Sequence, residues 1–210
     1  MRGESSTANK RERVALYGGA FDPIHNGHLA TIAALLASGL VERVLVVPSG
    51  DRPDKALNAA GAERLAMTSL AVRESFGGDG RVTVSDIHVA QKVGFGTIDL
   101  VDYFKKEAHL EPLVVIGCEL LKDLSQWKEG ERLKAETHFV VIPRPGVKDV
   151  EIPRGVTATT LATPYEASVH VSSTTLRAMF AKGLSCAGLM PQSVIAHCNA
   201  HGLYGARKVS

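Results

Sequence analysis

Short apolar runs alternate with amphipathic stretches along most of this chain. Four runs are apolar at every position and stop at a glycine or a proline, as is typical of buried strands: Val14–Tyr17, Val44–Val47, Leu113–Ile116 and Phe139–Ile142. Residues Val82–Ser85 predict a further strand. Continuously apolar strands of this kind favour a parallel sheet that is covered on both faces.

Apolar positions spaced by three and four residues predict helices between and after these strands. The predicted helices are Gly27–Ser38, Ala62–Glu74, Thr97–Lys106, Ser173–Lys182 and Pro191–Ala200, with a short helical region that contains Trp127. The alternation predicts an α/β, Rossmann-like, doubly wound parallel sheet with helices on both faces. Such sheets bind ligands beyond the carboxyl ends of their strands. We therefore expect the chemistry after Tyr17, Pro48 and Ile116, and around residue 172.

Composition and charge predict one folded domain. The chain has 210 residues, of which 45% are hydrophobic and 22% charged. Residues 1–13 hold four basic and two acidic residues and so carry the whole net charge of +2. We expect a flexible tail over residues 1–12 and a single domain over residues 13–210, with a small helical part at its C-terminal end.

The same numbers exclude several classes of protein. Since the domain is neutral overall, an extended nucleic-acid-binding face is not expected. No apolar run approaches the roughly 18 residues of a membrane span. The three cysteines lack CxxC spacing, which favours a reducing cytoplasm over a disulfide framework.

The segment GGAFDPIHNGH, Gly18 to His28, carries the strongest chemical signal. Its two glycines allow a ligand to approach the backbone closely, and the helix that follows presents free N–H groups to an anion. His25 and His28 are three residues apart, so both can reach that helix end and donate hydrogen bonds to phosphate oxygens. The alternatives are a simple tight turn, two helix-capping histidines, or a metal site that lacks an obvious third ligand.

A second signal is HVSSTTLR, His170 to Arg177. Ser172 or Ser173 can cap the helix that begins there, and capping alone would explain them. The alternative is an anion site, in which the hydroxyls and free N–H groups act together with the guanidinium of Arg177.

Taken together, these two segments resemble the paired signatures of the HxGH nucleotidyltransferase superfamily, specifically the nicotinate/nicotinamide mononucleotide adenylyltransferases. The resemblance extends from Val14 to Tyr204. It includes VPSG at Val47–Gly50, PDK at Pro53–Lys55, ERLAM at Glu63–Met67, GTID at Gly96–Asp99, IGCE at Ile116–Glu119, Trp127, RPG at Arg144–Gly146, and the stretch from Met190 to Tyr204.

The resemblance implies transfer of AMP from ATP to nicotinate mononucleotide, or to nicotinamide mononucleotide, with release of pyrophosphate in NAD biosynthesis. The acceptor's own phosphate is then the nucleophile, so the protein supplies positioning and charge stabilisation. Mg²⁺ would accompany ATP, held through phosphates and water, with no protein-bound metal. The expected partners are these nucleotides, with no nucleic acid or membrane, and the expected location is the cytoplasm.

The resemblance also implies roles for individual residues. The catalytic set would be His25, His28, Lys55 and Arg177. The ATP-binding set would be Gly18, Gly19, Ala20, Phe21, His25, His28, Gly117, Glu119, Ser172, Ser173, Thr174 and Arg177. The mononucleotide would be held by Gly19, Lys55, Thr97, Trp127 and Arg144, with the base near Thr97 and stacked on Trp127.

The sequence departs from the family pattern mainly on the acceptor side. Asp54 replaces a histidine, Gly96 replaces an aromatic residue, Glu119 replaces an aspartate, and Gln91–Gly96 does not match the usual loop. Two alternatives therefore stay open: a nucleotidyltransferase of the same superfamily with another phosphorylated acceptor, and a nucleotide-binding sensor that has lost catalysis. His197, Cys198 and His201 could form a metal cluster, but their place in the terminal helix favours a structural role.

Overall fold

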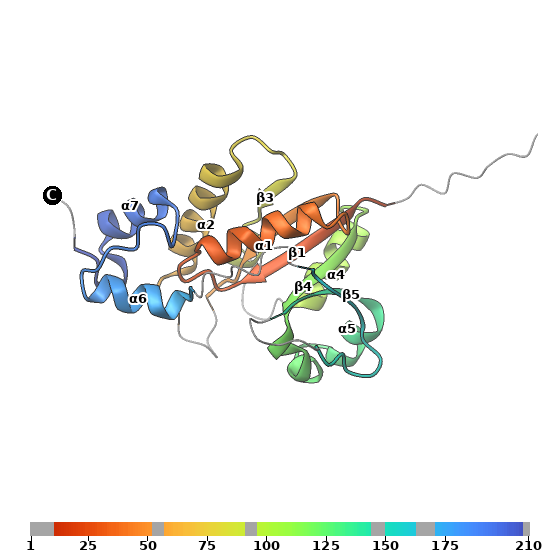
Figure 1. The fold of residues 1–210 in the computed structure, drawn as a ribbon. Helices are drawn as coiled ribbons and strands as arrows, with labels where there is room; N and C mark the ends of the chain where they lie inside the picture. Colours follow the sequence, from red (N-terminus) through yellow and green to blue (C-terminus); the bar gives the residue numbers. More distant parts are fainter. Residues whose placement is uncertain (1–10, 52–56, 91–95, 144–149, 163–170, 208–210) are drawn as a thin grey trace, which may run out of the picture.

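The computed structural model describes residues 11–51, 57–90, 96–143, 150–162 and 171–207. A six-stranded sheet in the order β3-β2-β1-β4-β5-β6 forms its centre (Figure 1). The strands are β1 Arg13–Gly19, β2 Arg43–Pro48, β3 Val82–Val84, β4 Glu111–Gly117, β5 His138–Ile142 and β6 Thr157–Thr160. All five pairings are parallel. This is the Rossmann order: the chain adds strands on one side of β1 as far as β3, and then adds β4, β5 and β6 on the other side.

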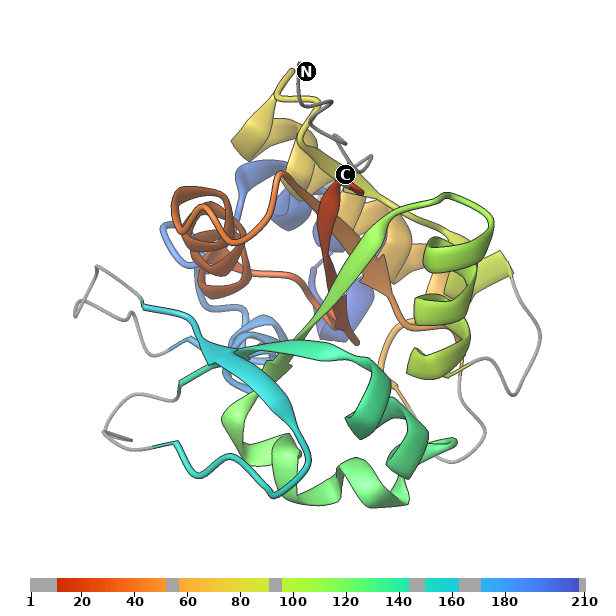
Figure 2. The same ribbon diagram turned by 90° about the vertical axis from the view of Figure 1, so that its right-hand side faces the viewer.

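Helices cover both faces of the sheet. They are α1 Asn26–Ala37, α2 Gly61–Phe76, α3 Ile87–Ala90, α4 Thr97–Lys106, α5 Gly130–Glu136, α6 Ser173–Ala181 and α7 Gln192–His201, with 3₁₀ helices η1 Cys118–Gln126 and η2 Leu203–Gly205. In Figure 2, α1 (dark orange) and α4 (green) lie on opposite sides of the central strands. Figure 1 shows α7 beside α2, and α6 packs against η2.

Alternating side chains of the strands build one core on each face. In β1, Ala15 and Tyr17 join a cluster with the apolar faces of α1, α2, α6 and α7. Val14 and Leu16, one position out of phase, join a second cluster with α4, η1 and α5. Because neighbouring residues in a strand point to opposite faces, a strand buried on both sides must be apolar at every position. This confirms the predicted doubly wound α/β fold.

The predicted strands and the five predicted helices are present, with ends displaced by at most two residues. Four elements were not predicted: α3, α5, η2 and β6. The sequence of β6, TATT, lacks an apolar run. The segment around Trp127 differs from the prediction, since Trp127 has extended backbone angles and lies between η1 and α5. Of the predicted N-terminal tail, only residues 11 and 12 are described. Among the described residues, no helix is long and apolar enough to cross a membrane.

Candidate active site

The predicted ligand-binding edge lies where the strands end. Gly19 at the end of β1 is level with Pro48 at the end of β2, and Gly117 at the end of β4 is level with Ile142 at the end of β5. Since β1 and β4 are neighbours and their connections leave in opposite directions, a crevice is expected beyond Gly19 and Gly117. The side chains that follow these strand ends are the candidates for chemistry.

The end of β1 requires glycine at one position and leaves space at another. A Cβ at Gly19 would come within 2.8 Å of the ring of Phe21, which is buried and has a φ of 47°. A Cβ at Gly18, in contrast, would meet nothing within 4 Å, and this residue is exposed. Ala20 is half-buried. The backbone at Gly18 is therefore open to close approach by a ligand.

His25 and His28 form a stacked pair at the start of α1. His25 is the N-cap residue and is 7% exposed, and its ring lies 3.7 Å from that of His28, centroid to centroid. The backbone N–H of His25 donates to Nδ1 of His28 over 3.2 Å. Because Nδ1 accepts this bond, the proton of a neutral His28 ring lies on Nε2.

Burial keeps both rings uncharged at neutral pH. Burial lowers the pKa of His25 to about 4. Burial, and secondarily the neighbouring His25, lower the pKa of His28 well below its ordinary value. The pair therefore offers N–H donors at the helix start without two unpaired positive charges.

The start of α6 is bonded directly to the loop between β1 and α1. The hydroxyl of Ser173 donates to the carbonyl oxygen of Pro23 over 2.8 Å, although the two residues are 150 positions apart. The guanidinium of Arg177 donates to the carbonyl oxygen of Asp22 over 2.8 Å and to Oγ1 of Thr174 over 3.2 Å. The two sequence motifs therefore meet at one loop, and the helix starts of α1 and α6 flank it.

Ser172 has the capping role that sequence alone would assign to it. It is the N-cap residue of α6, and its Oγ accepts from the backbone N–H of Thr175 over 3.1 Å. Ser172, Ser173 and Thr174 thus all lie in the first turn of this helix, whose free N–H groups can face an anion.

Asp22 is a central residue of this loop that the sequence did not single out. It is 3% exposed, and its carboxylate accepts four hydrogen bonds: from the backbone N–H and the amide of Asn58 at 2.7 and 3.1 Å, from the backbone N–H of Ala59 at 3.1 Å, and from the hydroxyl of Tyr204 at 2.7 Å. Asp22 therefore joins the loop between β1 and α1 (residues 20–25, here called the phosphate-side loop) to the start of α2 and to the C-terminal segment.

Arg64 is a second residue that sequence reasoning missed. Its guanidinium is completely buried and donates to four backbone carbonyl oxygens: those of Ala59 at 3.0 Å, Ala20 at 2.9 Å, Ser49 at 2.6 Å and Gly50 at 3.1 Å. These carbonyls belong to the loops after β1 and β2 and to the approach to α2. A single planar cation thus fixes three segments relative to one another.

On the other side of β1, the predicted mononucleotide residues come from neighbouring segments. Thr97 is the first residue of α4, and Trp127 follows η1 and is half-buried against the second core cluster. Lys128 pairs with Asp99 at 2.9 Å, which joins the residue after Trp127 to the first turn of α4. The segments that carry Thr97 and Trp127 therefore lie side by side.

Gly117 and Glu119 lie at the junction of β4 and η1. Gly117 ends β4, and a Cβ there would come within 2.6 Å of the carboxylate of Glu119, so the backbone and this side chain are in close contact. Both residues are half-buried. Lys55 and Arg144, predicted to contact phosphate and substrate, lie outside the described residues, as does Asp54.

Comparison with known proteins gives one consistent family. A family model described as cytidylyltransferase-like matches residues 16–179. A relative from Thermus thermophilus, named "Probable nicotinate-nucleotide adenylyltransferase", is 34% identical over 91% of this chain and 99% of its own length. A Synechococcus relative (strain JA-2-3B'a(2-13)) of the same name is 31% identical over 93% and 98%.

Solved structures share the fold. Plasmodium falciparum nicotinic acid mononucleotide adenylyltransferase, complexed with NaAD, superposes with a TM-score of 0.77 at 22% identity, over 92% of this chain and 97% of that one. The same enzyme complexed with APC gives a TM-score of 0.73 at 20% identity, over 92% and 97%. At these identities the likeness shows that the architecture is the same.

Proposed function

The chain belongs to the cytidylyltransferase-like family, among the nicotinate-nucleotide adenylyltransferases, and from this membership we propose that it transfers AMP from ATP to nicotinate mononucleotide. The products are nicotinate adenine dinucleotide and pyrophosphate, and the reaction is a step of NAD biosynthesis. The observation that carries the proposal is the direct bonding of Ser173 and Arg177 to the carbonyls of Pro23 and Asp22. It supports a single triphosphate site built from both motifs.

The reaction needs no protein nucleophile. An oxygen of the acceptor's phosphate forms a bond to the α-phosphorus of ATP, the bond from that phosphorus to the bridging oxygen breaks, and pyrophosphate leaves with the electron pair. Negative charge grows on the phosphate oxygens as this happens. The protein's task is to align the two phosphates and to place donors where the charge develops.

The residues at the two helix starts suit that task. We assign the principal contact with the α-phosphate to the Nε2–H of His28, since Nδ1 is occupied by the backbone of His25. His25 and the first turn of α6 add further donors, and Arg177 supplies the fixed positive charge. Backbone at Gly18, Gly19, Ala20 and Phe21 is assigned to the nucleotides, as are Gly117 and Glu119; Lys55 and Arg144 keep their proposed roles.

The acceptor side supports a pyridine base that carries a carboxylate. Trp127 is half-buried, so one part of the indole is held in the core and another part can stack on an aromatic ring. The start of α4 at Thr97 provides free N–H groups and the positive end of a helix dipole. A carboxylate gains more than a neutral amide from that end, which favours nicotinate over nicotinamide mononucleotide.

Mg²⁺ is assigned to ATP and not to a protein cage. The carboxylate of Asp22, which lies in the phosphate-side loop, is already engaged by four hydrogen-bond donors. A cation bound largely by phosphate oxygens and water, as Mg²⁺ prefers with nucleotides, fits such a site. When bound, the ion would offset charge on the triphosphate while the chain's own donors orient it.

A different phosphorylated acceptor is the second candidate. Gly96, which replaces an aromatic residue, is packed against the side chain of Lys128, where a Cβ would come within 3.3 Å. The surroundings of Thr97 therefore differ from those that the family pattern leads us to expect.

Pyrophosphate release from ATP and Mg²⁺ tests the proposal, with nicotinate and nicotinamide mononucleotide assayed in parallel. We expect release with nicotinate mononucleotide and slower release, or none, with nicotinamide mononucleotide. Arg177→Lys should reduce kcat/KM for ATP, whereas Lys182→Ala, which removes an exposed cation at the end of the same helix, should match the wild type. ATP binding without release for either acceptor would overturn the proposal and favour another acceptor or a sensor.

A further inference from the structure

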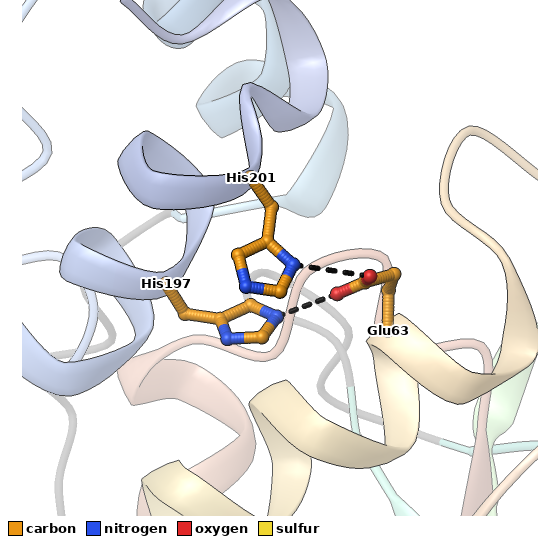
Figure 3. Close-up of side chains that lie close together, drawn as sticks. All are labelled: Glu63, His197 and His201. Carbon is orange, nitrogen blue, oxygen red and sulfur yellow. Dashed lines mark hydrogen bonds and ion pairs between the residues drawn. The ribbon is translucent and has the colours of Figure 1, made fainter. Parts of the chain in front are cut away.

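Three metal-ligating side chains converge where α7 packs on α2, a place to which the proposed reaction assigns no role (Figure 3). Nε2 of His197 lies 2.6 Å from one carboxylate oxygen of Glu63, and Nδ1 of His201 lies 3.1 Å from the other. The rings of the two histidines are 4.1 Å apart, centroid to centroid. One ligand atom from each residue lies within 4.8 Å of the other two.

The residue types and their spacing match those of a transition-metal site. His197 and His201 are four residues apart in α7, so both project from one face of the helix, an arrangement that recurs in zinc proteins. Imidazole nitrogens and a carboxylate oxygen are ligands that Zn²⁺ accepts at about 2.0–2.2 Å. Tetrahedral geometry at that radius separates the ligand atoms by roughly 3.4 Å, so small side-chain rotations suffice.

The cluster is accessible to an ion from solvent. The exposed side-chain fractions are 13% for His197, 30% for Glu63 and 47% for His201. An ion can therefore enter without unfolding the chain, and water can complete its coordination. Cys198, the third candidate from the sequence, is not part of the cluster: it is buried, with its sulfur 3.6 Å from that of Met67.

We propose that Glu63, His197 and His201 bind one divalent transition-metal ion of the Zn²⁺ class, which fastens α7 to α2. The ion would replace the protons on the rings of His197 and His201 that now face the carboxylate of Glu63. This differs from the expectation of no protein-bound metal, because Glu63 is 134 residues from His197 and sequence alone does not pair them.

The expected role of the ion is structural. At its other end, α7 is already attached to α2, since the carboxylate of Glu74 accepts from the backbone N–H groups of Gln192 at 3.0 Å and Ser193 at 2.8 Å. After α7 the chain turns into η2, where Tyr204 donates to Asp22 in the phosphate-side loop. A metal at the cluster would hold this C-terminal segment at both ends of α7.

Metal titration of the untagged, chelator-treated full chain tests the proposal without nucleotide, so its outcome is separate from that of the adenylyltransferase assay. At about pH 7.5, calorimetry with ZnCl₂ should show one saturable site of micromolar or tighter Kd. The ion should also raise the Tm, because it binds the folded chain.

His201→Gln and Glu63→Gln each keep a hydrogen-bonding side chain, and each should weaken Zn²⁺ binding at least tenfold and abolish the rise in Tm. His109→Asn is the matched control, since His109 is exposed and asparagine accepts its φ of 52°; its binding should equal that of the wild type. Absence of a saturable site in the wild type, or the same Kd in both glutamine variants, would overturn the proposal and leave a plain histidine–carboxylate contact.

Discussion

Replacing Arg64 by lysine removes the guanidinium that connects the loops around the proposed triphosphate site. Arg64 is completely buried, and its nitrogens donate to carbonyl oxygens of Ala20, Ser49, Gly50 and Ala59. An ammonium group is a single point with three donors and cannot reproduce a planar fork that spans these positions.

The expected loss of stability follows from the acceptors left behind. Each buried carbonyl that loses its donor costs about 1–3 kcal/mol. The lysine ammonium can satisfy one or two of the four oxygens, so two or three of them lose their donor, and we expect the free energy of unfolding to fall by about 3–5 kcal/mol. Because Ala20 lies in the loop after β1, KM for ATP should also rise.

Urea denaturation followed by the fluorescence of Trp127, the single tryptophan, measures this loss. Arg73→Lys is the matched control, since Arg73 is an exposed arginine of the same helix, and it should change stability by less than about 0.5 kcal/mol. An Arg64→Lys protein as stable as the control would refute the view that the buried guanidinium holds these loops together.

Three further predictions follow. His28→Ala should lower kcat by about 10²-fold with an unchanged circular dichroism spectrum, because a transition-state donor is lost; near-normal turnover would remove His28 from that role. Tyr204→Phe should cost about 1.5–3 kcal/mol in urea denaturation, because it deletes a 2.7 Å hydrogen bond to Asp22; an unchanged midpoint would contradict this. The pKa of His25 is about 4 in the folded protein, against about 6.5 when unfolded, so the unfolded chain binds more protons between these values. Stability should therefore fall as the pH drops from about 6.5 to about 4, and His25→Asn should reduce this dependence, with His28 supplying what remains; equal slopes for both proteins would count against the burial argument.

The fold was predictable because its strands are buried on both faces. In β1, β2, β4 and β5 the apolar run itself marks the strand, and the helices between them have regular apolar faces. The strand β6 was not predictable in this way, because Thr157–Thr160 hold three threonines and one alanine and are only partly covered. Its place in the sheet depends on pairing with β5, a long-range contact with no local signal.

The candidate site was predictable only where residues share a motif. Gly18–His28 and Ser172–Arg177 could each be located from their own spacing, although nothing local says that Arg177 bonds to the carbonyl of Asp22. Arg64 was missed because most of its partners are backbone oxygens, which carry no sequence signature. Glu63 was missed because its histidines lie at the far end of the chain.

Radioactive ATP tests adenylyl transfer most directly. The phosphorus label is placed at either the α or the γ position, and its fate in the products is measured. With nicotinate mononucleotide and Mg²⁺, the α label should appear in nicotinate adenine dinucleotide and the γ label in pyrophosphate, in equal amounts. Appearance of the α label only in free AMP, or retention of both labels in ATP while the protein still binds the nucleotide, would contradict the proposed function.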